Sequence, residues 1–400
     1  MKRIITCAAL IAFATLDTSP LHAQSPTVPS DADIRQILAD RIDRDRQSVG
    51  IVLGVIDAKE AGHRRVITYG SLEKGDSRPL NADTMFEIGS VTKVFTSLLL
   101  ADMVQRREVA LTDPVAKYLP ADVKMPERNG RAITLQDLAT HTSGLPRLPT
   151  NFTPKDPANP YADYSVAQLY QFLSTYTLPY DIGSRYEYSN LGGGLLGHVL
   201  ARHAGMDYEA LVRSRITGPL GMTSTSVTLS ADQQRRLAVG HNDRLASVLN
   251  WDLPTLAGGG ALRSTANDML TFVAANLGAT PSPLVSAMSA MLTDRRPTGM
   301  PGLDWRSVGT FSRGTMTTSF GTTAAPEDTA VSLDSAPGRR SASSCFRIRA
   351  RRRASTTSGC TSWTRDFPRC NRRSHTPKSL SIRIYSMAMW ARISSRRTSC

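Results

Sequence analysis

Cysteine is scarce in this 400-residue chain: apart from Cys7, its four cysteines, Cys345, Cys360, Cys370 and Cys400, all lie in the last segment. A domain without cysteine needs no disulfide framework, even when it is exported. The spacing of the four late cysteines matches no zinc-binding pattern. We therefore expect a fold held together by an ordinary hydrophobic core, without disulfides or a metal.

Long apolar runs are missing after residue 23, so we expect no integral membrane segment in the mature protein. The first 23 residues have the parts of a secretory signal: Lys2 and Arg3, an apolar run over residues 4–14, and Leu21-His22-Ala23 before Gln24. We expect residues 1–23 to be a signal peptide and the mature protein to be periplasmic or secreted.

Net charge is absent from the body of the chain, although the whole carries +14. Residues 331–400 hold 15 Arg and one Lys against Asp334 and Asp366, whereas the preceding residues hold 32 basic and 32 acidic side chains. A basic tail with Arg351-Arg352-Arg353 is the best evidence for a nucleic-acid partner. Export and the lack of interleaved aromatic residues argue against it, so we expect no nucleic-acid partner.

The stretch Phe86–Arg107 combines a predicted buried helix with candidate chemistry. Apolar residues recur at three- and four-residue spacing from Val91 onward, with no Gly or Pro inside, which predicts a largely buried helix that begins at Ser90. Ser90 and Lys93 would share one face of this helix, one turn apart. A buried lysine loses its proton more readily and can activate a serine hydroxyl. Ser90 is therefore a candidate nucleophile and Lys93 its activating partner.

The S-x-x-K pattern is weak evidence alone, because Ser71-Leu72-Glu73-Lys74 fits it equally well. That second copy lies between Gly70 and Gly75 and predicts a hairpin turn. The bland interpretation of Ser90 is an N-cap serine with Lys93 in solvent.

A second constellation, Tyr188-Ser189-Asn190, comes just before another predicted helix. A tyrosine near a lysine can carry a proton, and an asparagine can orient a substrate amide. The bland interpretation is a core tyrosine and an N-cap asparagine. The combination with FEIGSVTK about a hundred residues upstream favours a catalytic site.

Hydrophobic periodicity predicts the remaining elements. We expect strands over residues 48–57 and 64–69, a short helix that opens at Thr134 with Asp137 holding its first turn, and helices over 165–178, 191–205, 208–216, 266–276 behind a capping Ser264, and 284–292. Residues 151–164 are rich in Pro, Asn and Asp and predict a surface loop that rims a cleft. The glycines within 192–197 weaken their helix, so we expect a neighbour packed closely against it.

These motifs resemble the class C β-lactamase and penicillin-binding-protein family of serine hydrolases. FEIGSVTK and YSN look like its first and second motifs, and HTSGLP at 141–146, GPLGM at 218–222 and GGGALRSTANDM at 258–269 look like further landmarks, in family order from about residue 34 to 310. The resemblance implies Ser90 as the acylated nucleophile, Lys93 and Tyr188 as the proton-transfer pair, and Asn190 as a substrate ligand. It also implies an α/β fold, with an antiparallel sheet flanked by helices and a mostly helical region.

The third motif of this family, K-T-G or H-x-G on a strand, is missing between about residues 310 and 345. If translation of the codons for residues 316–328 starts two nucleotides later, they permit DDVVWHNGGTGG, which contains H-x-G after a strand, and the codons for 341–346 permit VGVVVL. We therefore predict a frameshift near residues 313–316. It would have removed the C-terminal strands, leaving a hydrolase domain over 24–315 and a basic, disordered tail over 316–400. The alternative is a genuine basic tail.

The sequence thus favours an exported serine acyl hydrolase that acts on β-lactams or related cell-wall amides and esters. It would work as a monomer on a small-molecule substrate, without a cofactor. The alternative is a non-turnover penicillin-binding protein or an inactive pseudoenzyme, derived from a DD-peptidase or an esterase.

Overall fold

The computed structural model describes residues 29–57, 63–242, 244–293, 295–297, 303–306, 309–312 and 343–345. The predicted signal peptide lies outside the described residues. So does most of the predicted tail, together with nearly all of the segment in which the third motif is missing.

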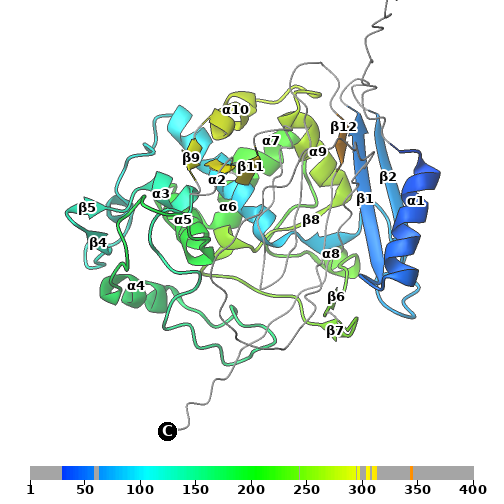
Figure 1. Ribbon diagram of the computed structural model, residues 1–400, viewed down its shortest axis with the longest axis horizontal. Helices are drawn as coiled ribbons and strands as arrows, with labels where there is room; N and C mark the ends of the chain where they lie inside the picture. Colours follow the sequence, from blue (N-terminus) through cyan, green and yellow to red (C-terminus); the bar gives the residue numbers. More distant parts are fainter. Residues whose placement is uncertain are drawn as a thin grey trace, which may run out of the picture.

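An antiparallel sheet forms one end of the molecule (Figure 1). Strand β1 (Gly50–Asp57) pairs antiparallel with β2 (Arg64–Gly70), which confirms the predicted pair of strands. Alternate residues Ile51, Leu53 and Val55 belong to a core cluster with helix α1. On the opposite face, Gly54 lies against α9, where an added Cβ would be 2.9 Å from the Leu270 side chain. Burial on both faces explains the unbroken apolar run of β1.

Helix α1 (Asp31–Ala39) covers the outer face of this sheet and was not predicted from the sequence. A capping box fixes its start, because Ser30 Oγ accepts from the Asp33 N–H and the Asp33 carboxylate accepts from the Ser30 N–H. Ile34 and Leu38 are its buried residues. Ile37 also packs against the same cluster. Because the helix has only these few apolar side chains, its apolar periodicity is short and weak.

The larger, mostly helical region surrounds α2 (Thr92–Gln105), the predicted central helix. The other helices are α3 (Leu135–Ala139), α4 (Val166–Thr175), α5 (Asn190–His203), α6 (Tyr208–Val212), α7 (Gly218–Leu220), α8 (Ala231–Arg235), α9 (Ala266–Asn276) and α10 (Val285–Thr293). Residues from most of these helices form one continuous core, in which Phe95 of α2 stacks on Phe272 of α9 at 4.5 Å between ring centres. This shared core fixes α2 against both the sheet and the helical region.

Most predicted helices are confirmed, with small corrections at their ends. Thr134 caps α3 in a capping box with Asp137, as predicted. Helix α9 is capped by Thr265 and not by Ser264, whose hydroxyl instead bonds Thr225 at 2.7 Å. The predicted helix over 208–216 is α6 followed by a π-helical turn, Arg213–Thr217.

Short strands complete the described fold, and the strand pairs are antiparallel. They are β3 (Met85–Glu87) with β8 (Arg263–Thr265), β4 (Glu127–Arg128) with β5 (Arg131–Ala132), β6 (Gly240–His241) with β7 (Ser247–Val248), and β9 (Arg295–Pro297), β10 (Leu303–Arg306) and β11 (Gly309–Ser312) in one sheet.

One short strand lies within the predicted tail. Residues 343–345 form β12 (Ser343–Cys345), which pairs antiparallel with Val55–Asp57 at the edge of β1 (Figure 1). An unpaired strand edge offers backbone N–H and C=O groups to any extended segment, whatever its side chains. The pairing of β12 with β1 therefore does not depend on the side chains of residues 343–345.

Candidate active site

Strand β3 leads directly into the turn that carries Ser90. The strand is fixed by pairing with β8, and the next residue, Ile88, donates its N–H to Leu262 O at 3.1 Å. Gly89 then takes φ +49°, and a 3-10 turn over Gly89–Val91 runs into α2. The α-helix thus begins at Thr92, two residues after the predicted start. The Ser90 side chain caps neither the turn nor the helix, so the bland interpretation of Ser90 as an N-cap is wrong.

Lys93 lies in the protein interior with only 6% of its surface exposed, and not in solvent. Its Nζ donates to three acceptors: Ser90 Oγ at 2.9 Å, Asn190 Oδ1 at 2.9 Å and Gly259 O at 2.5 Å. Burial holds the pKa of Lys93 well below its ordinary value, and the charge of Arg147 lowers this pKa further. The amine is therefore close to Ser90 and easier to deprotonate than a surface lysine.

Tyr188 approaches Ser90 from the second motif. Its hydroxyl donates to Ser90 Oγ at 2.6 Å, and its ring centre lies 4.9 Å from Lys93 Nζ. Ser90 Oγ thus contacts both the amine and the phenol, and the serine itself is only 3% exposed. The structure brings the three predicted catalytic side chains together.

Asn190 is the first residue of α5, but its side chain does not cap the helix. The cap is Ser189, whose Oγ accepts from the Gly192 N–H at 2.8 Å. This frees the Asn190 amide to accept from Lys93 and to face Tyr161 Oη, 3.4 Å from its Nδ2. The prediction of an N-cap asparagine, the bland alternative, is therefore wrong.

His141 fixes the backbone of the second motif through two hydrogen bonds. Its carbonyl accepts from the Glu187 N–H at 2.8 Å, and its Nδ1 accepts from the Ser189 N–H at 3.2 Å. The ring lies 4.7 Å from the Tyr188 ring. Burial lowers the pKa of His141 to about 3, so the imidazole is neutral and its Nδ1 can remain an acceptor.

Further along the same loop, the backbone carbonyls of Pro146 and Arg147 hold the start of α5. Pro146 O accepts from Ser189 Oγ at 2.6 Å, and Arg147 O accepts from the N–H groups of Asn190 and Leu191, each at 3.1 Å. These contacts give the HTSGLP landmark a physical role as the frame of the second motif. Its His141 takes φ +57°, a conformation that local patterning does not reveal.

Glycines of α5 let the remaining partner of Lys93 approach. A Cβ on Gly193 would lie 2.9 Å from Lys93 Cε, and a Cβ on Gly197 would lie 2.7 Å from Gly258 Cα. The Ala257–Gly259 turn can therefore rest on α5, which brings Gly259 O to Lys93. This confirms the close neighbour predicted for the glycines of this helix. The role of Gly259 was missed, because a backbone carbonyl leaves no signal in the sequence.

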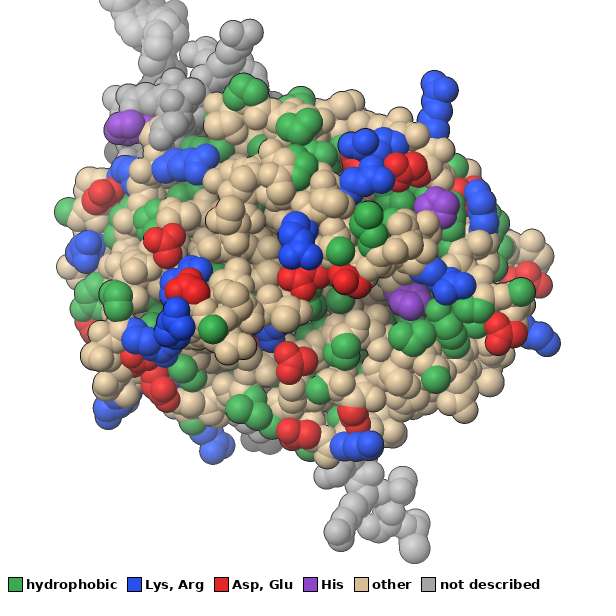
Figure 2. All heavy atoms as spheres, turned by 180° about the vertical axis from the view of Figure 1, so that it is seen from behind, with side chains coloured by type: hydrophobic (Ala, Val, Ile, Leu, Met, Phe, Trp, Pro, Cys, Tyr) green, Lys and Arg blue, Asp and Glu red, His purple; other side chains and the backbone are tan. Residues whose placement is uncertain are grey.

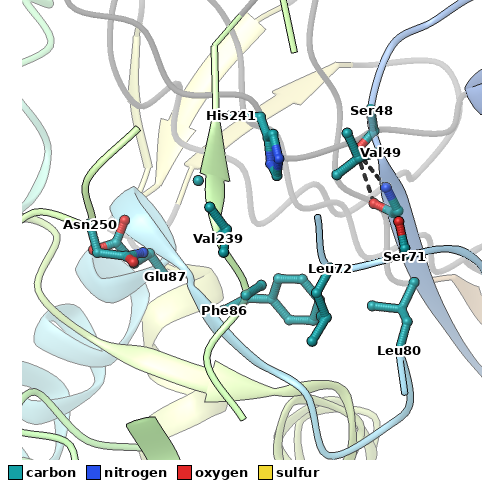
Figure 3. Close-up of a pocket in the computed structure, with 13 residues that line it drawn as sticks. Ser48, Val49, Ser71, Leu72, Leu80, Phe86, Glu87, Val239, His241 and Asn250 are labelled. Atoms are coloured by element: carbon teal, nitrogen blue, oxygen red, sulfur yellow. Dashed lines mark hydrogen bonds between the residues drawn. The ribbon is translucent and has the colours of Figure 1, made fainter. Parts of the chain in front are cut away.

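A separate pocket lies beside Glu87, three residues before the nucleophile (Figure 3). Figure 3 shows the Glu87 side chain next to Asn250, with Phe86 and Leu72 across the pocket. Glu87 accepts from the Trp251 N–H at 2.8 Å and lies 3.4 Å from Arg263. Burial raises the pKa of Glu87. These contacts tie β3 to the segment around Trp251, a supporting role outside the Ser90 cluster.

The predicted rim loop, residues 151–164, contributes to the site through Tyr161. Its ring lies 5.4 Å from Trp251 and 4.9 Å from Phe152 between centres. Asn159 of the same loop exchanges hydrogen bonds with Asp252 at 2.8 and 3.0 Å. Aromatic packing and these two hydrogen bonds therefore anchor the loop beside Asn190.

Charges of both signs are interspersed over the face seen in Figure 2. That face agrees with the neutral body predicted from the sequence. Within the described ranges, no helix has the length and apolar character needed to cross a membrane.

Comparison with known proteins places these features in context. The Beta-lactamase family model matches residues 31–339. The D-alanyl-D-alanine-carboxypeptidase/endopeptidase AmpH of Escherichia coli (strain K12) is 38% identical over 275 residues, 68% of this chain and 69% of its own. A beta-lactamase of Lysobacter lactamgenus is 28% identical over 283 residues, 69% of this chain and 67% of its own.

Solved structures agree with the sequence relatives. A beta-lactamase/D-alanine carboxypeptidase from Yersinia pestis superimposes with a TM-score of 0.61 at 27% identity, over 77% of this chain and 86% of its own. A class C beta lactamase from Rhodobacter sphaeroides gives 0.55 at 30% identity, over 66% and 70%. The predicted fold class, helices with antiparallel sheets, is confirmed.

Proposed function

The chain belongs to the beta-lactamase family of serine hydrolases, and on that premise we propose that it is an exported serine acyl hydrolase. Its substrates are β-lactams or related cell-wall amides and esters, which it cleaves through an acyl-serine intermediate. The observation that carries the proposal is the contact of Ser90 Oγ with both Lys93 Nζ at 2.9 Å and Tyr188 Oη at 2.6 Å.

The acylation step follows from these contacts. Ser90 Oγ forms a bond to the substrate carbonyl carbon, and its proton passes to the neutral amine of Lys93 or through Tyr188. The carbonyl carbon then loses its bond to the leaving nitrogen or oxygen, which takes that proton. The Ser90 N–H, in the turn that leads into α2, is the first donor for the oxyanion. Water later cleaves the ester on Ser90 and restores its hydroxyl.

The relatives favour two substrate classes. AmpH is named as a D-alanyl-D-alanine carboxypeptidase and endopeptidase, and other relatives are named beta-lactamases. A β-lactam and a D-alanyl-D-alanine peptide share an amide flanked by a carboxylate, so one nucleophile can attack both. Asn190 is the proposed ligand of the substrate's side-chain amide. Export rests on the signal-like residues 1–23.

A non-turnover penicillin-binding protein is the second candidate. It is favoured by the absence of K-T-G and H-x-G from residues 310–345. That strand would supply the second oxyanion donor, so its loss would weaken acylation and deacylation without moving Ser90.

The test is to incubate the full chain with benzylpenicillin and follow the intact mass over time. A transient adduct on Ser90 supports the hydrolase, and a persistent adduct supports the binder. We expect Ser90→Ala to form no adduct. Ser71→Ala, in the second S-x-x-K sequence, is the matched control and should react like the parent. An unmodified parent chain would contradict both candidates.

A further inference from the structure

Arg147 places a guanidinium cation beside the site. Its guanidinium carbon lies 5.3 Å from the centre of the Tyr188 ring, and its side chain is half-buried. Its backbone carbonyl, and not its side chain, holds the start of α5. Among the described residues, the guanidinium has no hydrogen-bond or ion-pair partner. The loop therefore does not need the charge of this side chain.

The described part of the site contains no anion that balances the charge of Arg147. The three acceptors of Lys93 are a hydroxyl, an amide and a backbone carbonyl, all neutral. The nearby acids are engaged elsewhere: Glu87 with Trp251 and Arg263, and Glu187 with Tyr180 and Arg185. An anionic group of a ligand would balance the charge of the Arg147 guanidinium.

The position of Arg147 indicates which part of a substrate it meets. Its backbone carbonyl accepts from the Asn190 N–H. Burial raises the pKa of Tyr161, whose hydroxyl accepts from the Asn190 amide, and the charge of Arg147 opposes this rise. Arg147 thus lies on the Asn190 side of the nucleophile. If Asn190 holds the substrate's side-chain amide, the guanidinium faces the substituent beyond that amide.

We propose that Arg147 binds a carboxylate on the side-chain substituent of the substrate, so that the site prefers acyl donors with an anionic side chain. A guanidinium presents two parallel N–H groups that match a carboxylate. This inference rests on the proposed function, because it narrows the substrate class of the same site.

Carbenicillin and benzylpenicillin form a suitable probe pair, because they differ by one carboxylate on the side chain. Their affinities are measured by calorimetry on the full-length Ser90→Ala protein, which cannot be acylated at that position. We expect carbenicillin to bind at least about tenfold more tightly, the range for one hydrogen bond to a charged group. Arg147→Gln should remove this preference, and Arg147→Lys should keep part of it.

Arg185→Gln is the matched control. Arg185 also lies over a tyrosine ring, 4.3 Å from the centre of Tyr180, whereas the tyrosine that contacts Ser90 is Tyr188. We expect it to leave the preference unchanged. Equal binding of the two penicillins, binding of neither, or a preference that survives Arg147→Gln would overturn the inference. The parent chain could fail to react with penicillin while the preference for carbenicillin still depends on Arg147. That result would support the role of Arg147 and reject the proposed function.

Discussion

At the scale of single residues, the chemistry depends on the environment of Lys93. Burial and the charge of Arg147 both lower its pKa, while three hydrogen bonds hold its Nζ in place. The amine is thus fixed next to Ser90 before any substrate arrives. Such positioning removes a reorganisation step from proton transfer.

The pH dependence of acylation follows from this environment. If neutral Lys93 is the base, the acylation rate should rise with pH and level off below 10.5, the ordinary lysine value, because the pKa of Lys93 is lowered. Stopped-flow acylation by a chromogenic β-lactam measures this profile. Lys93→Ala should slow acylation about 10²- to 10⁴-fold. A rate that falls with pH across this range would contradict the assignment.

His141 should make folding stability depend on pH. The folded protein keeps this imidazole neutral down to about pH 3, whereas an unfolded chain binds the proton near pH 6.5. Because the unfolded state binds more protons, the free energy of unfolding should fall as pH drops below about 6.5. Between pH 6.5 and 5 this amounts to about 2 kcal/mol.

Urea denaturation of His141→Asn checks this expectation. Asparagine tolerates positive φ better than most residues, so the variant should fold and lose that part of the pH slope. His63→Asn, at an exposed position, is the control and should keep it. An unchanged slope in His141→Asn would assign the effect to other groups, such as His198 and His241, whose pKa values burial also lowers.

At the scale of elements, α5 combines two uses of glycine. Gly197 lets the backbone of Gly258 approach, whereas Gly193 makes room for the Lys93 side chain. Substitution by alanine adds helix propensity of about 1 kcal/mol at either position. The contacts of the new Cβ decide whether this helix propensity increases the free energy of unfolding.

We expect Gly197→Ala to destabilise the protein by about 1–3 kcal/mol, because its Cβ would meet a rigid backbone atom at 2.7 Å. Gly192→Ala, whose Cβ would meet Ser189 at 3.3 Å, is the matched control and should change stability far less. Urea unfolding compares the two. Equal loss of stability would show that contact with Gly258 is not the cause.

Gly193→Ala should affect chemistry more than stability. Its Cβ would displace the flexible end of Lys93, 2.9 Å away, and move Nζ from Ser90. We expect acylation at least tenfold slower, with stability close to that of the parent. Rates measured as for Lys93→Ala test this, and an unchanged rate would show that Lys93 adapts without leaving Ser90.

Element types were largely predictable, whereas several functional contacts were not. The capping box Thr134–Asp137 and the apolar face of α2 are local patterns that the sequence carries. The pairing of β3 with β8 joins segments far apart in the chain. Each strand has only three residues, too few for periodicity to indicate a partner.

At the scale of the whole molecule, the open question is the C-terminal part. The predicted frameshift near residues 313–316 would replace the strands that complete the sheet beside β1. Sequencing the DNA across these codons in independent isolates tests the prediction. A single intact frame in all of them would contradict it.

A chain expressed from the corrected frame offers a functional test of the same prediction. It should regain an H-x-G strand and turn over β-lactam or peptide substrates faster than the 400-residue chain. It should also unfold at a higher urea concentration. The 400-residue chain, expressed in parallel, is the control. Equal turnover and equal stability would indicate that residues 316–400 serve the fold as they stand.

The sequence by itself determined the family resemblance and the four candidate residues Ser90, Lys93, Tyr188 and Asn190, because residue type and spacing along a helix are local properties. Tertiary structure decided that Lys93 is buried, that Ser189 and not Asn190 caps α5, and that Gly259 and His141 hold the cluster. These facts depend on which segments meet in space. Burial and backbone contact arise only when the chain packs, so spacing alone does not contain them.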